Sequence, residues 1–266
     1  MEKRMQKEQM MLSNLTLIIM QIRKDHPTMG VRSMYYMICP KGIGRDKFEL
    51  LCKELGITTH RIRNYRITTD SRGVTRFDNL TQNITLNRIN QLWNSDITYF
   101  EVNGRFYYIT FIVDAFSRVI VGYSVSDSLS TEKTTLKAMK MAISKRGSNV
   151  ILHSSLILHS DGGGQYYCKE FVSYLRLHNI RSSMCEHPWE NGKAERINGI
   201  IKNNYLIHRN IKNYKDLCKE VTRSVKLYNE CKPHICLHRM TPMQFEKYLY
   251  LQSQQNSIAT VALDVN

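Results

Sequence analysis

The sequence predicts an α/β fold, in which a mixed sheet with the element order βββαβαβα is flanked by helices. Two observations predict the sheet. Three strand-like segments at 92–100, 105–114 and 118–125 are joined by short turns, as in an antiparallel meander. Between 131 and 206, helical segments then alternate with short apolar strands. A third observation, a run of helical segments within 13–55, predicts a separate helical module before the sheet.

The N-terminal module begins with a helix predicted at 13–24. Ser13 is a suitable cap for it, and aliphatic residues recur behind Ser13 at helical spacing. The stretch "HPTMG" then breaks the chain, and two further helices are predicted at 31–38 and 45–55. Three helices joined by tight turns resemble a helix-turn-helix module. A plain helical cap on the larger fold is the alternative.

The chain is strongly basic. It carries 38 Lys and Arg against 23 Asp and Glu, a net charge of +15, and its pI is about 9.5. Such an excess indicates a polyanionic partner, nucleic acid first and an anionic membrane second. Arginines are dense in the stretch 59–76, and we expect Arg61, Arg63 and Arg66 to contact DNA phosphates. A solvated loop is the alternative reading of this stretch.

Hydropathy and cysteine usage bear on location. No apolar run approaches the roughly 20 residues that a membrane span needs. The first apolar run is too short and too periodic for a signal peptide. The seven cysteines are odd in number and scattered, which is typical of reduced thiols in a cytosol. We therefore expect a cytoplasmic protein with no membrane association.

The remaining elements follow from periodicity and from turn residues. Thr131 opens a helix at 131–146, and the C-terminal run 212–251 is helical with one interruption. Between them, the pattern predicts the strand 156–160, the helix 167–178, the strand 180–184 and the helix 190–206. The predicted division is a helical module at 1–67, a basic linker at 68–89, a core with C-terminal helices at 90–251, and a loose tail at 252–266.

Three carboxylates fall on elements that the fold can bring together. Asp96 lies inside the first strand, Asp161 directly follows the fourth strand, and Glu195 lies on a later helix. If the fourth strand pairs in parallel with the first, the two aspartates become neighbours, and the helix brings Glu195 over them. Clustered carboxylates raise one another's pKa unless a cation neutralises them. Carboxylate oxygens are the ligands that Mg²⁺ prefers, and the glycines 162–164 leave room for a DNA backbone.

Two other polar residues near these carboxylates are predicted to be structural. Asp114 lies at the end of the second strand, where we expect it to fix the turn to the third strand. His159 precedes Asp161 by two residues, and we expect a hydrogen-bonded histidine of the core.

Six short blocks, in a fixed order between His26 and Phe245, resemble the DDE transposases with a retroviral-integrase-like catalytic core. The resemblance is greatest to the second-reading-frame protein of two-frame bacterial insertion sequences. The blocks are "HPTMGVRSM", "LWNSDITYF", "VDAFSRVIVGYSV", "LHSDGGGQY", "ENGKAERINGIIK" and "YNECKPHICLHRMTPMQF". They cover most of the chain.

The resemblance implies an RNase H-like fold and metal-dependent cleavage and strand transfer of insertion-sequence DNA. It implies that Asp96, Asp161 and Glu195 are the catalytic residues and hold two Mg²⁺ or Mn²⁺ ions. The second aspartate and Glu195 are 34 positions apart, slightly fewer than is usual in the family. Glu190 is therefore the alternative third ligand, and Glu195 is favoured because the residues after it follow the family pattern.

The resemblance also implies partners. These are the DNA of the element ends and of the target, further copies of this chain in the DNA complex, and the upstream-frame protein or a frameshift fusion with it. We expect the protein at the bacterial nucleoid. Lys202 lies two helical turns after Glu195 and is expected to grip a phosphate, or else to be an ordinary solvated lysine. Lys193 and Arg196 are further candidates for DNA contact.

Two other functions remain open at this point. One is a ribonuclease of the same fold that acts on RNA–DNA hybrids, against which the N-terminal helices and the arginines argue. The other is a decayed or domesticated relative that binds DNA without cutting it, against which the intact carboxylate set argues.

Overall fold

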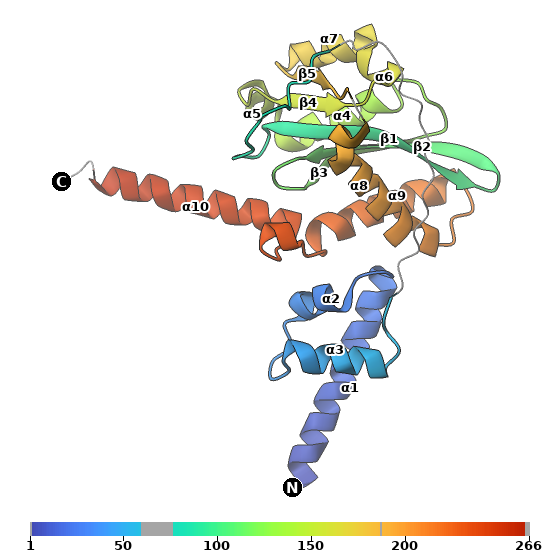
Figure 1. Ribbon diagram of the computed structural model, residues 1–266, viewed down its shortest axis with the longest axis vertical. Helices are drawn as coiled ribbons and strands as arrows, with labels where there is room; N and C mark the ends of the chain where they lie inside the picture. The colour runs from blue at the N-terminus through green and yellow to red at the C-terminus, as the bar shows by residue number, and fades with distance from the viewer. Residues whose placement is uncertain (1, 60–76, 187, 264–266) are drawn as a thin grey trace.

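The computed structural model describes residues 2–59, 77–186 and 188–263. A five-stranded mixed sheet lies between helices on both faces, and a unit of three helices lies beside this body (Figure 1). The strand order is β3-β2-β1-β4-β5, in which β1, β2 and β3 are antiparallel while β4 and β5 run parallel to β1. The strands are β1 (Leu92–Val102), β2 (Arg105–Asp114), β3 (Ile120–Ser126), β4 (Ile157–Ser160) and β5 (Arg181–Met184). The predicted RNase H-like α/β fold is confirmed.

The helices form two layers around the sheet. The first layer comprises α4 (Thr135–Arg146), α5 (Ser148–Leu152), α6 (Gly164–Tyr167) and α7 (Lys169–Leu177). The second comprises α8 (Gly192–Asn204) and α9 (Tyr214–Glu230), and α10 (Pro242–Leu263) follows α9. Short 3₁₀ turns lie at η1 (Pro188–Asn191), η2 (Leu206–His208) and η3 (Ile235–Leu237).

Strand β2 shows why this part of the sequence is apolar throughout. Ile112 faces the cluster formed with α4 and α7, whereas Ile109, Phe111 and Val113 face the cluster formed with α8 and α9. Side chains alternate between the two faces of a strand, so a central strand covered on both sides is hydrophobic at nearly every position.

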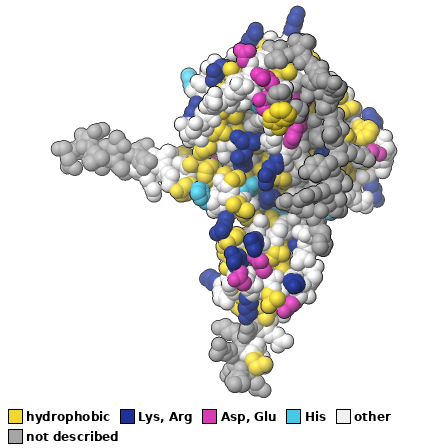
Figure 2. All heavy atoms as spheres, in the orientation of Figure 1, with side chains coloured by type: hydrophobic (Ala, Val, Ile, Leu, Met, Phe, Trp, Pro, Cys, Tyr) yellow, Lys and Arg dark blue, Asp and Glu magenta, His cyan; other side chains and the backbone are white. Residues whose placement is uncertain are grey.

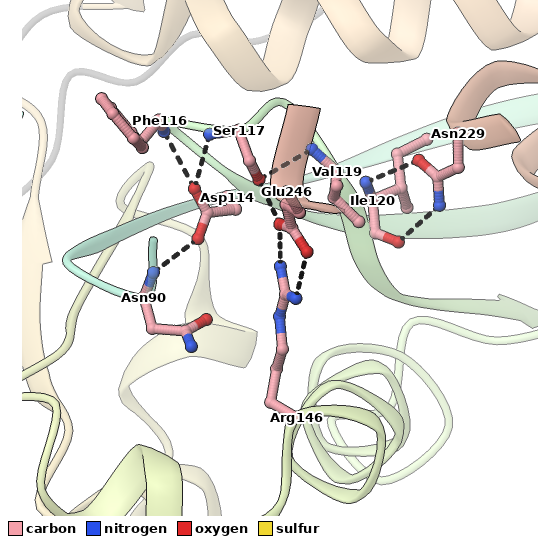
Figure 3. A network of polar contacts seen from close by, with 9 residues as sticks. All are labelled: Asn90, Asp114, Phe116, Ser117, Val119, Ile120, Arg146, Asn229 and Glu246. Carbon is pink, nitrogen blue, oxygen red and sulfur yellow. Dashed lines mark hydrogen bonds and ion pairs between the residues drawn. The ribbon is translucent and has the colours of Figure 1, made fainter. Parts of the chain in front are cut away.

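The two hairpin connections are specified locally. Asn103 and Gly104 join β1 to β2, with φ of 52° and 76°, the left-handed pair that a tight hairpin of this kind requires. Between β2 and β3, Asp114 accepts hydrogen bonds from the backbone N–H groups of Phe116 and Ser117 at 2.9 Å, and from that of Asn90 at 2.7 Å (Figure 3). The prediction that Asp114 fixes this turn is confirmed.

The N-terminal unit has a core of its own. It consists of α1 (Glu2–Asp25), α2 (Val31–Ile38) and α3 (Arg45–Glu54), which bury a shared aliphatic cluster around Phe48. The unit contacts the second helical layer, because Asp25 forms an ion pair with Arg223 of α9, and His26 Nδ1 lies 3.0 Å from Tyr205 Oη. The three predicted helices are thus present and share one buried cluster.

Three helix bounds were predicted wrongly. The first helix begins at Glu2 rather than at Ser13, because residues 2–12 contain neither Gly nor Pro and are rich in strong helix formers. Residues 252–263 belong to α10 rather than to a loose tail, and they also lack Gly and Pro. The helix predicted from Thr131 begins only at Thr135, after a turn.

The start of α10 is fixed to the body by a buried ion pair (Figure 3). The carboxylate of Glu246 accepts two hydrogen bonds from the Arg146 guanidinium of α4, one of 2.6 Å and one of 2.5 Å. The Ser117 hydroxyl, in the β2–β3 turn, donates to the same carboxylate. Both charged side chains are nearly inaccessible to solvent, at 13% and 11% exposure, so this pair is shielded from screening by salt.

Part of the predicted basic linker is packed against the sheet. Leu80, Ile84 and Leu86 contact the buried cluster formed by Leu92, Ala115 and Ile157, and the Leu80 N–H donates to Ser183 Oγ of β5 at 2.9 Å. The description of 68–89 as a linker is therefore wrong for its second half, from residue 77. Arg61, Arg63 and Arg66 lie outside the described residues.

Membrane insertion finds no support in the helices. Within the residues that the structure describes, none of the helices is both long enough and apolar enough to cross a bilayer.

Gly122 of β3 gives a test of the packing between sheet and helix. A Cβ atom at this position would lie 2.3 Å from the Ala138 carbonyl oxygen and 2.8 Å from Ala142 Cβ, both on α4. Gly122→Ala should cost about 1–3 kcal/mol of stability through overpacking, which for a chain of this size lowers the melting temperature by about 2–4 °C per kcal/mol. Gly199→Ala, in α8 with its nearest neighbour at 4.0 Å, is the control. Equal melting temperatures for the two variants would contradict the close β3–α4 contact.

Candidate active site

Asp96 and Asp161 are brought together by the parallel pairing of β1 with β4. In this register Asn94 lies opposite His159, so each aspartate lies two residues further along its own strand. Because side chains repeat every two residues, both carboxylates project from the same face and from the same end of the pair. In open sheets, ligands bind at the carboxyl ends of such strands, beside the point where the strand order reverses.

The opposite wall of the site is one stripe of α8 and of the turn that precedes it. The polar residues of this stripe are spaced by four, three and four positions, the spacing of a single helical face. They are Asn191, Glu195, Asn198 and Lys202.

Three of these residues bond to alternate positions of β1. Asn94 Nδ2 donates to Asn191 Oδ1 at 3.3 Å, Asn198 Nδ2 donates to Asp96 Oδ2 at 2.7 Å, and Lys202 Nζ donates to Thr98 Oγ1 at 3.1 Å. From Asn198 to Lys202, four helical residues rise about 6 Å, and the two strand residues from Asp96 to Thr98 rise about 6.6 Å. The helix and the strand therefore match over this interval, and the three bonds fix how far α8 is displaced along β1.

Glu195 is the member of the stripe that makes no hydrogen bond to β1 in the described structure, and its side chain is exposed. Its negative charge still contributes to the raised pKa of Asp96, whereas that of Glu190 acts on His159. One carboxylate oxygen of Glu190 accepts the Glu186 N–H at 2.6 Å. The geometry therefore favours Glu195 over Glu190 as the partner of the aspartates.

The two aspartates are electrostatically strained. Burial, the charge of Asp161 and the charge of Glu195 raise the pKa of Asp96 to about 7, against the opposing hydrogen bonds from Ile97 and Asn198. Burial also raises the pKa of Asp161, which accepts the Gly163 N–H at 3.1 Å. Neither aspartate forms an ion pair with a Lys or Arg of the described residues.

The atoms around this pair fit a hard divalent cation. Asn198 Oδ1, on the side chain whose amide nitrogen donates to Asp96, is a buried acceptor without a hydrogen-bond partner in the described structure. The thiol of Cys185 is nearby, but burial and Asp161 raise its pKa to about 11, so it stays protonated. A set of carboxylate and amide oxygens is the chemistry that Mg²⁺ or Mn²⁺ selects.

The Glu195 carboxylate does not lie in a ligand position in this structure. Among the described residues, no three His, Cys, Asp or Glu side chains lie close enough to one another to hold a metal ion. Of the three predicted site carboxylates, the structure thus pairs Asp96 with Asp161 and leaves Glu195 at the rim, exposed on the same face.

The glycines after Asp161 serve close contacts. None of Gly162, Gly163 and Gly164 has a positive φ, so a need for left-handed backbone does not explain them. A Cβ at Gly162 would lie 2.5 Å from Met184 Cε, and a Cβ at Gly163 would lie 3.1 Å from Asp161 Oδ1. Side chains here would therefore press on the site itself.

The predicted basic residues flank the carboxylates unevenly. The charge of Asp96 acts on Lys202, since it opposes the lowering of the Lys202 pKa by burial. The Lys202 ammonium lies 3.1 Å from Thr98 Oγ1 and 4.9 Å from the Tyr99 ring centre. Lys193 is half-buried, and burial and the charge of Arg118 lower its pKa, while Arg196 is exposed. Lys and Arg side chains gather in the middle of the face in Figure 2, where the sheet body meets the N-terminal helices.

Several site residues were not predicted from the sequence. Asn191 and Asn198 orient α8 against β1, and their spacing around Glu195 was the signal that could have revealed them. Arg118, beside Lys193, belongs to the "DAFSR" turn, for which only Asp114 was considered. His159 is a core histidine as predicted, since its Nδ1 lies 2.9 Å from Ser183 Oγ and burial lowers its pKa.

Comparison with known families gives two matches to the described body. A family model for an integrase core domain matches residues 87–187, and a second model of the same description matches residues 177–242. Together they cover the sheet, both helical layers and every candidate carboxylate.

Curated relatives are transposases of bacterial insertion sequences. A putative transposase InsK for the insertion sequence element IS150 of Escherichia coli (strain K12) is 25% identical over 193 residues, which are 72% of this chain and 66% of the relative, just under two thirds. The transposase for insertion sequence element IS629 of Shigella sonnei is 27% identical over 241 residues, which are 89% of this chain and 79% of the relative.

Among solved structures, one similar chain is the catalytic core domain of the HTLV-2 integrase in complex with magnesium. It is 23% identical, with a TM-score of 0.47, and the alignment covers 59% of this chain and 95% of that one.

Gly163 provides a test of the close packing around Asp161. Gly163→Ala should push the Asp161 carboxylate by a few tenths of an ångström and lower metal-dependent DNA cleavage by about tenfold, because catalysis is sensitive to displacements of this size. Its melting temperature should stay near that of the parent protein. Gly164→Ala, whose Cβ would meet only the Tyr167 hydroxyl at an ordinary 3.5 Å, is the matched control and should keep activity. An equal loss of cleavage activity in Gly163→Ala and Gly164→Ala would contradict the close packing of Gly163 against Asp161.

The raised pKa of Asp96 predicts how stability depends on pH without divalent cations. The folded protein keeps a proton on Asp96 up to about pH 7, while the unfolded chain releases it near the ordinary value of 3.8. Stability therefore falls as the pH rises through that window. Asp96→Asn should abolish this loss and raise the melting temperature in EDTA at about pH 8 by several degrees, with little difference at about pH 4.

The same experiment reports on the cation. Mg²⁺ should raise the melting temperature of the parent protein at about pH 8 and have little effect on Asp96→Asn, because binding to the folded state alone is stabilising. Glu101→Gln, an exposed carboxylate on the same strand, is the control and should behave as the parent. If Asp96→Asn melts at a lower temperature than the parent protein in EDTA at about pH 8, the carboxylate of Asp96 is not electrostatically strained.

Proposed function

We propose that this chain, which belongs to the integrase-core transposases of bacterial insertion sequences, cleaves and joins DNA with Asp96, Asp161 and Glu195 as its catalytic residues. The observation that carries the proposal is the register of β1 and β4, which sets two carboxylates side by side under the α8 stripe that carries Glu195. The activity of a DNA transposase follows from the family, and the named residues are the proposal.

The three carboxylates would hold divalent cations, Mg²⁺ or Mn²⁺, and we propose two of them. When bound, such ions would supply charge stabilisation to the attacking and leaving oxygens of a phosphoryl displacement. Asp96 and Asp161 would supply the inner ligands, and a change in the Glu195 rotamer would complete the set from the rim of the site.

The neighbours of these carboxylates have positioning roles. Asn198 is a positioning residue, because its amide holds Asp96 Oδ2 while the Ile97 N–H holds Oδ1 at 2.9 Å, and together the two bonds fix the orientation of that carboxylate. The Asn94–Asn191 bond fixes the start of α8, one turn before Glu195. The Gly163 N–H fixes one oxygen of Asp161, since it donates to Oδ1.

Basic residues would place the DNA. Lys202, at the end of the stripe nearest Tyr99, is suited to hold a phosphate beside the carboxylates. Lys193 and Arg196 would extend this contact along the helix. The arginines at 61, 63 and 66, which follow the N-terminal unit in the sequence, would add phosphate contacts that weaken as salt rises.

The proposal extends to assembly. Two element ends have to be handled together in strand transfer, so we propose that copies of this chain associate on DNA. An upstream-frame protein, or a frameshift fusion with it, is proposed as a further partner. These proposals rest on the family and not on a contact within the chain.

The assignment of the three carboxylates is tested by substitution. Asp96→Asn, Asp161→Asn and Glu195→Gln should each lower metal-dependent cleavage and joining of DNA that carries the element ends, by on the order of 10³-fold or more. Circular dichroism and melting curves should show an intact fold, because all three side chains lie at the surface of the site rather than in a core cluster.

Glu190→Gln is the matched control and should stay within a few-fold of the parent activity. If Glu190→Gln is inactive and Glu195→Gln active, the third ligand is Glu190. If all four variants keep activity, the chain does not use this site, and a nuclease assay on RNA–DNA hybrids and a DNA-binding assay then separate the other two functions.

A further inference from the structure

We infer that a cavity beside the carboxylates receives one unstacked nucleobase of the DNA strand, next to the phosphate that is cleaved. The inference rests on the proposed function, in that it takes DNA to be the substrate. It adds a subsite with its own recognition chemistry, formed by the packed segment before β1 and by the turn before α8.

The cavity is large enough for a base. Its volume is about 410 Å³, and it opens between residues 81–94 on one side and 189–193 on the other. Pockets that bind small organic groups usually measure about 300–1,000 Å³. The wall on the first side is apolar and comprises Ile84, Leu86 and Leu92, of which Leu92 is buried in the cluster that fixes this segment to the sheet.

The other wall carries an aromatic platform. Trp189 lines the cavity and is 73% exposed. A large exposed indole that borders a cavity with an aliphatic wall is unusual for a monomeric surface. Base stacking on an aromatic side chain tolerates every base, because each base has a π-face. Trp189 and the aliphatic wall can therefore hold the two faces of a planar ring.

A buried acceptor supplies the polar contact. Asn94 lines the same cavity and is only 3% exposed. Its Nδ2 is used by Asn191, but its Oδ1 has no partner in the described structure. An unpaired buried acceptor is costly, and an N–H donor from the ligand would satisfy it. The exocyclic amino groups and ring N–H groups of nucleobases are such donors.

The cavity has the right position relative to the proposed chemistry. Asn94 and Asp96 lie on the same face of β1, two residues and about 6.6 Å apart. This is the scale of one nucleotide step of an extended strand, so a base held at Asn94 leaves its phosphate near Asp96. Lys193 also lines the cavity and supplies a positive charge for the backbone at its mouth.

The one acidic lining residue does not block this assignment. One oxygen of Glu190 is taken by the Glu186 N–H, and a carboxylate can accept from a base amino group in the way that Glu and Asp accept from cytosine. The pocket is therefore suited to a base rather than to a second phosphate, which the Glu190 carboxylate in its lining would repel.

Intrinsic fluorescence tests the inference on the intact chain. The chain contains two tryptophans, and Trp93 is fully buried, so quenching by an added strand reports on Trp189. In EDTA, where cleavage is absent, a short oligothymidylate should quench this fluorescence. A strand of the same length and phosphate count whose sites are all abasic should bind without quenching.

Variants separate stacking from charge. Trp189→Ala should bind the oligothymidylate about tenfold more weakly than the parent, as expected for the loss of one base stack, and Trp189→Phe should restore most of the affinity. Tyr250→Ala removes an aromatic residue of similar exposure, 63%, on the distant α10, and should bind as the parent does. Melting temperatures should be unchanged, because both side chains are exposed.

Each outcome decides the matter. Equal quenching by the abasic strand, or unchanged affinity of Trp189→Ala, overturns the inference and leaves only phosphate contacts at this cavity. The proposed function fails separately, if Asp96→Asn still cleaves DNA. Because the binding experiment contains no metal ion and measures no cleavage, a failure of one does not imply a failure of the other.

Discussion

The parallel pairing of β1 with β4 is the contact on which the site depends. The two strands pair over only three residue pairs, the last of which is Asn94 with His159. Two residues after this last pair, each segment carries an aspartate. Without this pairing, Asp96 would lie in a hairpin sheet and Asp161 on a surface turn. The pairing places two like charges together, which is unfavourable. The apolar clusters buried on both faces of the sheet stabilise the fold and offset this cost.

Helix α8 offsets the repulsion between the two aspartates only in part. Its stripe satisfies β1 with neutral or positive groups at three positions, and presents Glu195 at the fourth. A helix placed only by apolar packing could slide by a turn at little cost. The bonds of Asn191 and Asn198 fix its register, and hence the position of Glu195. Negative charge without a cation is left at the aspartates, where a substrate and its metal ions are proposed to bind.

The N-terminal unit is connected to this helix through its end. Tyr205 directly follows α8 and is buried, and its hydroxyl oxygen lies 3.0 Å from His26 Nδ1. Burial lowers the pKa of His26 to about 4, so the imidazole stays neutral at this contact. Arg209 donates to the Lys24 carbonyl, and Arg223 pairs with Asp25. The N-terminal unit and the helix of Glu195 thus share one interface.

The sequence by itself determined the element order, the meander, the role of Asp114 and the carboxylates worth testing, because strand alternation, turn residues and motif order are local properties. It misjudged 77–89 and 252–263, where weak local signals were decided by burial or by the absence of helix breakers. Only the tertiary structure decided the β1–β4 register, the stripe of α8 and the cavity at Trp189. These depend on contacts between segments about a hundred residues apart, which no local pattern encodes.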